Sequence, residues 1–422
     1  MEKVEYEKRL EEIKVNYLNK VTPNILYYDS KILVASINEM KQYLLTNYAK
    51  NYDQKLQGFI DSRLASVVPS FLKEKPLTYG YQMGLKGDYT KIFLYGGKES
   101  SLEEAKDITS KTVFDTASFT KLLVITFLYD LQAKGEFDLN ANIRKDTRKM
   151  FDLNCTWLQA LNWDYNIQSL GSIKDLDPTQ PLSRIIGEAF LKGSYILNDQ
   201  FVYNDIIYMI LSYRIENFEE KFHYFCEKNK MNTAKFQPNN YGLHATGGKA
   251  NNLHVPSDPK TQVMGNATGA AGVYVNANDM FAFGKVLNDL KEEDLALLLK
   301  LRDPNNIFAE GNKKSLGGVY HSHPNGMAKT DTPPSGTKDS ITSVGTSGVW
   351  FYYEKLLQTL GFYLFNPWSN LEGRRIDPRF GSNTNYLKIL IGELCHCLRY
   401  MEEVERLENN NLRDIKVLKR IS

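Results

Sequence analysis

The sequence predicts an α/β (α+β) fold in which an antiparallel sheet is flanked by helices and carries an inserted all-helical subdomain. Three observations predict it. The spacing of apolar residues changes from a helical to a strand-like period at residues 77–85 and 91–96. A short turn separates these two segments, which indicates a β-hairpin. Residues 349–353 and 361–365 are two later strand candidates. Between these pairs, residues 136–252 are helical and loop-rich with little alternation.

Composition describes an ordinary globular chain. Its 422 residues are 42% hydrophobic and 24% charged, which is long enough and apolar enough for a large core. The 52 basic and 50 acidic residues leave a net charge of +2, so charge favours neither a nucleic acid nor a membrane surface as partner. No run approaches the roughly 18 apolar residues of a membrane helix. The N-terminus lacks the apolar core of a signal peptide, so we expect a cytoplasmic protein with no membrane insertion.

The cysteines and histidines give little support for a metal. Four cysteines are too few and too irregular for a disulfide framework. Cys395-His396-Cys397 has no second cluster to complete a site, so packing on one side of a helix is the favoured interpretation. His321-Ser322-His323 also has no visible third ligand. We therefore expect neither a metal nor another cofactor.

The N-terminal third contains helices and then the hairpin. Residues 1–53 are rich in Glu and Lys and predict an accessory helical segment. An amphipathic pattern over 57–67 predicts a helix that stops at Pro69. The hairpin follows, and a charged loop over 98–111 leads to the next feature.

That feature is Ser118, which stands at a predicted helix start before the apolar run 122–128. Lys121 lies three residues later, so both side chains project from one face of the first turn. A serine becomes a useful nucleophile when a neighbouring base takes its proton, and a lysine against apolar residues can serve. The alternative is a helix cap followed by a solvated lysine. The helix should run to about Lys134, where Gly135 ends it.

Two further segments frame the second half of the chain. Tyr203-Asn204-Asp205 stands directly before an apolar helix, and its plainer interpretation is a helix cap with a packed tyrosine. The Gly/Ala-rich run 264–275 ends in a short strand before a capped helix over 280–290. Its glycines lack the spacing of a phosphate loop, so close backbone packing near a site explains them better. Residues 303–340 read as a long loop, and residues from Asn385 onward as helix.

Taken in order, these segments resemble the serine β-lactamase and penicillin-binding-protein superfamily, most closely its class C-like branch, which includes the family VIII carboxylesterases. The resemblance covers roughly residues 54–400. Residues 114–121 are similar to the Phe-x-x-Ala-Ser-x-Thr-Lys nucleophile motif. The other matches are the turn 135–140, the Tyr-x-Asn/Asp motif at 203–205, the Gly-x-Ala-Gly run at 269–274 and Gly345-Thr346-Ser347. We therefore divide the chain into an accessory segment 1–53, a hydrolase domain 54–400 containing the helical insertion 136–252, and a charged helical tail 401–422.

The resemblance implies a role for each site residue. Ser118 would attack an ester or amide carbonyl, while Lys121 and the Tyr203 hydroxyl would pass its proton to the leaving group. Asp205 would hydrogen-bond Lys121 or the substrate. The oxyanion would accept hydrogen bonds from the Ser118 N–H and from a second N–H on a nearby strand. That second N–H would come from the segment Ser343 to Thr346, which includes Gly345, on a strand that begins near Ser340. No cofactor is implied.

The departures from the family pattern narrow the expected substrate. Ser340-Ile341-Thr342 stands where the family has Lys/His-Thr-Gly, unless Lys338 serves after a shift. In the family, this basic residue helps to bind a carboxylate of the substrate. Its absence here therefore disfavours penicillins and D-Ala-D-Ala peptides as substrates. The cleft-wall stretch 158–164 is also altered. The sequence therefore predicts an esterase-like hydrolase of a small ester or amide. The alternatives are a D,D-peptidase or β-lactamase and a non-catalytic binding protein. Oligomeric state stays open.

Overall fold

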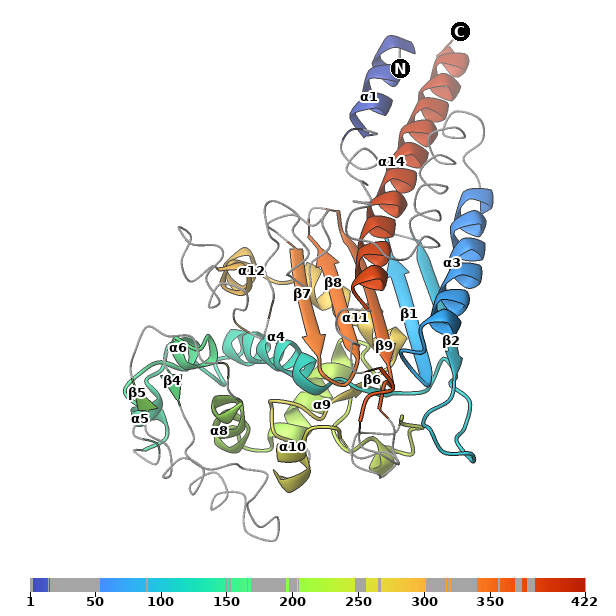
Figure 1. Ribbon diagram of the computed structural model, residues 1–422. Coiled ribbons are helices and arrows are strands. Elements are labelled where there is room, and N and C mark those ends of the chain that lie inside the picture. The colour runs from blue at the N-terminus through green and yellow to red at the C-terminus, as the bar shows by residue number, and fades with distance from the viewer. Residues whose placement is uncertain are drawn as a thin grey trace.

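The structure is a computed structural model that describes residues 3–13, 15, 54–88, 90–148, 151, 153–164, 166–167, 195–196, 203, 205–246, 256–264, 267–300, 316, 319, 340–355, 357–368, 374–377 and 384–421. Its centre is a five-stranded antiparallel sheet in the order β2-β1-β9-β8-β7 (Figure 1). The strands are β1 Gly80–Lys86, β2 Lys91–Gly97, β7 Ser340–Gly345, β8 Val349–Glu354 and β9 Thr359–Phe365. Strands from the two ends of the chain therefore build one sheet.

The predicted strands are confirmed. β1 and β2 form the expected hairpin, with Gly80 opposite Gly97 and Lys86 opposite Lys91. The two late strand candidates are β8 and β9. β1 pairs with β9, which joins the N-terminal hairpin to the C-terminal strands. Every residue of β8 and β9 is buried, because layers of helices cover both faces of the sheet.

Alternate residues of β8 enter two different cores. Trp350 and Tyr352 belong to the cluster beneath α3 Gln54–Glu74 and α14 Asn385–Ile421, on the face turned to the viewer in Figure 1. Phe351 and Tyr353 belong to the cluster on the opposite face. That opposite face contacts α11 Ala277–Asn288, and its cluster contains the apolar residues of α4 Thr120–Ala133. α12 Glu292–Leu299 lies beside β7.

The helical region lies to one side of the sheet, at the lower left of Figure 1. It contains α5 Ile143–Asp146, α6 Trp157–Leu161, α8 Ile206–Arg214, α9 Phe218–Lys228 and the 3-10 turn η5 Pro238–Tyr241. The prediction of helix between 136 and 252 holds for these elements. The structure adds one short strand pair within the same range, β4 Asn166–Ile167 with β5 Tyr195–Ile196.

The predicted helix stop at Pro69 is wrong. α3 runs from Gln54 to Glu74 with Pro69 inside it. A proline in a helix interior costs about 3 kcal/mol. The apolar face continues past it, and Val68 and Phe71 are completely buried, which offsets much of that cost. The Ser70 hydroxyl also donates to the Ser66 carbonyl one turn earlier, at 2.9 Å.

The two ends of the chain lie side by side (Figure 1). α1 Lys3–Ile13 packs against α14, and Leu10 enters the same cluster as Leu407. α14 begins at the predicted Asn385 and continues without a break across residue 401, so the proposed tail extends a helix that begins on the sheet. The division of the chain into domains stays a prediction.

Cys395 and Cys397 pack in the cluster beneath α14, as predicted, and all four cysteines are free thiols. In the described part of the chain no group of three or more His, Cys, Asp or Glu side chains could hold a metal ion. None of the described helices combines the length and apolarity needed to cross a membrane. The predictions on residues 16–53 and Asn204 lie outside the described residues, and so does the predicted loop over 303–339 apart from residues 316 and 319, with His321 to His323 and Lys338.

A glycine in β9 sets how closely α14 approaches the sheet. A Cβ at Gly361 would lie 2.2 Å from Ile391 Cγ2 on α14. We expect Gly361→Ala to destabilise the protein by about 2 kcal/mol, because overpacking a buried contact costs about 1–3 kcal/mol. Urea unfolding measures this. Gly96→Ala on the edge strand β2 is the control and should cost less than about 1 kcal/mol, because its nearest neighbour is the tip of the Tyr81 ring at 3.1 Å. Equal losses would contradict the packing argument.

Candidate active site

Ser118 lies in a tight turn that is fixed to the neighbouring backbone. β3 Phe114–Asp115 pairs with β6 Tyr274–Val275, and the 3-10 turn η3 Ala117–Phe119 follows. The Thr116 N–H donates to the Val273 carbonyl at 2.9 Å, and its hydroxyl donates to the same oxygen at 2.8 Å. Ala117 and Phe119 are buried, whereas Ser118 is partly exposed. Ser118 therefore lies at the start of a helical segment, as predicted. It belongs to the 3-10 turn η3, and α4 begins two residues later at Thr120.

The turn contains a strained residue that a buried carboxylate supports. Ala117 has φ of 42°, a left-handed conformation that is unusual for alanine. Its N–H donates to Asp115 Oδ1 at 2.9 Å, and Ser257 donates to Asp115 Oδ2 from its N–H at 2.7 Å and its hydroxyl at 2.5 Å. Burial raises the pKa of Asp115, and these hydrogen bonds oppose that rise. The carboxylate therefore holds the turn on which Ser118 is presented.

Lys121 points from the first turn of α4 toward Ser118. Its Nζ lies 3.3 Å from Ser118 Oγ, as the three-residue spacing predicts. It also donates to the Ala270 carbonyl at 2.8 Å and forms an ion pair with Asp205 Oδ1 at 2.7 Å. Lys121 is completely buried. The structure thus brings three predicted site residues together, and the Gly/Ala-rich run supplies a carbonyl to the same site.

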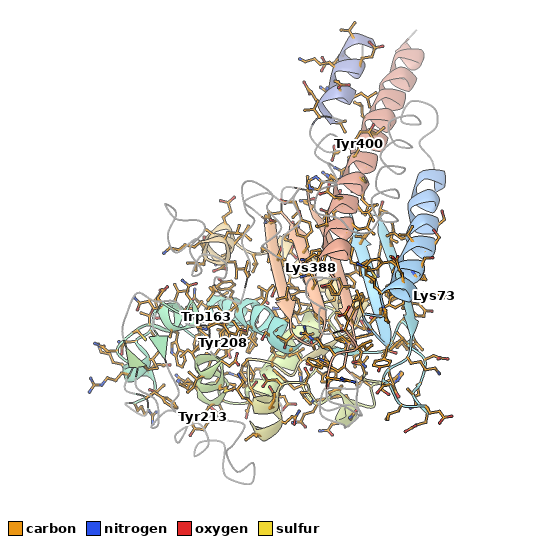
Figure 2. All side chains as sticks on the ribbon, viewed as in Figure 1. Lys73, Trp163, Tyr208, Tyr213, Lys388 and Tyr400 are labelled. Carbon is orange, nitrogen blue, oxygen red and sulfur yellow. The ribbon has the colours of Figure 1, made fainter. Side chains whose placement is uncertain are left out.

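Tyr203 lies beside this group with its ring toward the lysine. Lys121 Nζ is 5.1 Å from the centre of the Tyr203 ring and 5.7 Å from that of Tyr208. Trp163 packs against both rings, at 4.8 Å and 6.0 Å between centres. Figure 2 labels Trp163 and Tyr208 near α4, on the helical side of the site. Trp163 belongs to the altered segment 158–164, so this segment packs against the two tyrosine rings beside Lys121. A proton relay through the Tyr203 hydroxyl stays a prediction.

A second lysine, which the sequence analysis missed, also contacts Asp205. Lys260 lies in the short helix α10 Pro259–Met264, and its Nζ forms an ion pair with Asp205 Oδ2. Its side chain is 31% exposed, whereas that of Lys121 is 1% exposed. Burial, and to a smaller extent the charge of Lys121, lower the pKa of Lys260 to about 8. No motif singles out Lys260, because only the fold brings it to a carboxylate 55 residues away.

Strand β7 forms the other side of the site. A Cβ at Gly345 would lie 2.0 Å from the Thr116 carbonyl oxygen, so this strand contacts the nucleophile turn directly. The Ser347 hydroxyl donates to the Asp115 carbonyl at 2.6 Å. Ser340 and Ser343 are both buried in β7. The Ser343 hydroxyl makes no hydrogen bond within the described structure.

The prediction that Thr346 belongs to this strand is wrong. β7 ends at Gly345, and Thr346 is an exposed residue of the turn that leads to β8. The turn closes because the Gly348 N–H donates to the Gly345 carbonyl at 3.0 Å, with Gly348 at a φ of 105° that favours glycine. The Thr346 carbonyl accepts a hydrogen bond from the Arg375 guanidinium at 2.9 Å.

Comparison with known proteins identifies the fold. No family model and no curated protein sequence matches the chain. Among solved structures it is similar to a β-lactamase/D-alanine carboxypeptidase from Yersinia pestis, with 14% identity and a TM-score of 0.60 over 80% of this chain and 99% of that one. It is also similar to EstCE1, described as a hydrolase with promiscuous acyltransferase activity, with 13% identity and a TM-score of 0.59 over 79% and 100% of the two chains. A third is the D-amino acid amidase from Ochrobactrum anthropi SV3, with 14% identity and a TM-score of 0.56 over 77% and 96%. The chain therefore has the fold of the serine β-lactamase and penicillin-binding-protein superfamily, as its motifs predict.

Proposed function

We propose that the protein is a serine hydrolase that cleaves a small ester or amide through an acyl-enzyme on Ser118. The position of Lys121 carries the proposal. Its Nζ lies 3.3 Å from Ser118 Oγ, is shielded from water, and is held from a second side by Asp205. A nucleophile with a base in reach, and a third group that orients the base, is the arrangement required for covalent acyl transfer.

In this mechanism Ser118 Oγ attacks the substrate carbonyl carbon while its proton moves to neutral Lys121. The new oxyanion accepts hydrogen bonds from the Ser118 N–H and from a β7 N–H near Ser343. The carbon–oxygen or carbon–nitrogen bond then breaks, and the proton passes to the leaving group, with the Tyr203 hydroxyl as the proposed relay. Water attacks the acyl-enzyme by the same route and releases the acid. Besides the attacking water, these steps use side chains and backbone groups of this chain.

The β7 side of the site supports an esterase-like substrate class. Ser340 and Thr342 stand in place of the basic residue and the glycine of the family motif, and both are buried. Neither side chain is a cation, so neither can form the charge-assisted hydrogen bonds to a substrate carboxylate that are roughly twice as strong as neutral ones. We therefore propose, as the first candidate substrates, esters and amides that carry no carboxylate next to the bond that is cleaved. D,D-peptidase or β-lactamase activity is the second candidate, and the similarity to the Yersinia pestis enzyme keeps it open.

Covalent labelling tests the proposal. We expect a fluorophosphonate probe to form one adduct on the peptide that contains Ser118, and Ser118→Ala to abolish it. Ser70→Ala is the matched control, because Ser70 is exposed on α3 at the far side of the fold. Labelling by a fluorescent penicillin, measured in parallel, would instead favour the second candidate.

The absence of any adduct that depends on Ser118, with either probe, would overturn both enzymatic candidates. It would leave a binding protein that retains the fold without the chemistry. Both variants should keep a melting temperature close to that of the wild type, since neither serine is buried in the core.

A further inference from the structure

We infer that Lys260 is a positioning residue that supplies Asp205 with a second cation, so that Lys121 can give up its proton without leaving a buried carboxylate unpaired. This inference rests on the proposed function, in which Lys121 takes the proton of Ser118. It assigns a role to a residue that neither the nucleophile motif nor the Tyr-x-Asn/Asp motif contains.

The geometry places one carboxylate between two ammonium groups. Asp205 Oδ1 lies 2.7 Å from Lys121 Nζ, and Oδ2 forms an ion pair with Lys260 Nζ. The side chain of Asp205 is 12% exposed, so it is largely removed from water. The three groups come from α4, from the residue that precedes α8, and from α10. The fold thus joins three separate segments through a single carboxylate.

The charges explain why a second cation is needed. With Lys121 and Lys260 both protonated, the group carries a net charge of +1. When Lys121 becomes neutral, Asp205 and Lys260 remain as a neutral ion pair. Without Lys260, the same step would leave a buried carboxylate with no cation, and breaking a buried ion pair in this way is strongly unfavourable. Lys260 therefore makes the reactive form of Lys121 accessible.

The two other carboxylates on the surrounding elements hold hydrogen bonds elsewhere, and two tyrosine rings face Lys121. Asp258 precedes α10 and accepts hydrogen bonds from the Thr261 N–H and hydroxyl. Asp115 accepts from Ser257 on the same segment and from Ala117. Tyr203 and Tyr208 present their ring faces to Lys121. Of the three carboxylates in this region, Asp205 is the one that contacts both Lys121 and Lys260.

Lys121 and Lys260 repel each other across Asp205. Burial and the charge of Lys121 together lower the pKa of Lys260 to about 8. Removing the charge of Lys260 would remove this repulsion and leave Asp205 to hold the proton on Lys121. The pH dependence of acylation therefore tests whether Lys260 acts on Lys121 through Asp205.

The test measures the rate of fluorophosphonate labelling of Ser118 against pH in the full chain. In Lys260→Met the proton must leave Lys121 while it faces Asp205 alone, and an opposite charge favours the protonated form. We expect the acidic limb of the profile to move up by at least about one pH unit, which is at least a tenfold slower reaction at pH 7. Lys260→Arg should keep the limb near its wild-type position. Lys260→Gln gives a second neutral variant in case the methionine disturbs α10.

A double variant separates charge from structure. Adding Asp205→Asn to Lys260→Met removes the carboxylate that retains the proton, so the acidic limb should return at least to its wild-type position. Lys221→Met is the matched control, because it removes a lysine from a surface ion pair with Glu136 on the helical region, and it should leave the profile unchanged. A purely structural role for Lys260 would lower the rate equally at every pH.

The outcomes distinguish this inference from the proposed function. If wild-type protein is labelled at Ser118 but Lys260→Met and Lys260→Gln keep the wild-type acidic limb, the inference is wrong and the proposed function stands. A uniform loss across the pH range, without movement of the limb, would also overturn it. If Ser118 of the wild type takes no label at any pH, both fail together.

Discussion

Replacing Lys121 with methionine is expected to lower kcat/KM for a small activated ester such as p-nitrophenyl butyrate by about 10³-fold, since a positioned general base contributes about 10²–10⁴-fold. Methionine has a similar length and keeps the apolar contacts of this completely buried side chain. Asp205 would retain its ion pair with Lys260, so the substitution leaves no unpaired carboxylate. Steady-state hydrolysis, with thermal melting to confirm the fold, measures the effect.

Lys121→Arg distinguishes a base from a fixed charge. Arginine keeps the cation beside Asp205 but does not lose its proton at accessible pH. If Lys121 acts as the base, the arginine variant should be as inactive as the methionine variant at every pH. An arginine variant with substantial activity would show instead that Lys121 serves only as a positive charge near the oxyanion.

Local sequence patterns were sufficient for four of the five strands of the sheet, whereas β7 was expected only from the family resemblance. The hairpin at 80–97 and the strands at 349–354 and 359–365 could be predicted, because each is a run of strand-forming residues bounded by turn residues. The start of α14 was also found. Pro69 was misread because the local penalty of a proline says nothing about the apolar face that continues beyond it and packs against the sheet.

In the candidate site, too, the residues that are close in sequence could be predicted, and those brought together by the fold could not. Ser118 and Lys121 stand in one turn, so their spacing already places them together, and the order of motifs added Tyr203 and Asp205. Lys260 could not be predicted, because an exposed-looking lysine after a proline carries no signal. The same holds for the contact between Asp115 and Ser257, which are 142 residues apart. The sequence therefore identified the proposed reacting groups, but not the residues from distant segments that contact them.

Gly345→Ala is expected to lower kcat/KM by about 100-fold, because it would displace the segments on either side of Ser118. The added Cβ would lie 2.0 Å from the Thr116 carbonyl oxygen and 3.0 Å from its carbon, so either β7 or the turn that precedes Ser118 must move. In the proposed mechanism the two oxyanion donors belong to these two segments. Removing one such donor costs about 10²–10³-fold, and a displacement of about 1 Å can cost about 10²-fold. Hydrolysis rates per folded molecule measure the change.

Gly361→Ala provides the control for this variant, because it places a Cβ against α14 in the same sheet, on the side away from Ser118. Both substitutions should destabilise the protein, but only Gly345→Ala should slow hydrolysis by the folded fraction. A fluorophosphonate should also label the Gly345→Ala variant more slowly, since its phosphoryl oxygen uses the same two donors. If Gly345→Ala loses stability and keeps the wild-type rate, then β7 supports the nucleophile turn without supplying an oxyanion donor. The second N–H would then have to come from another segment beside Ser118.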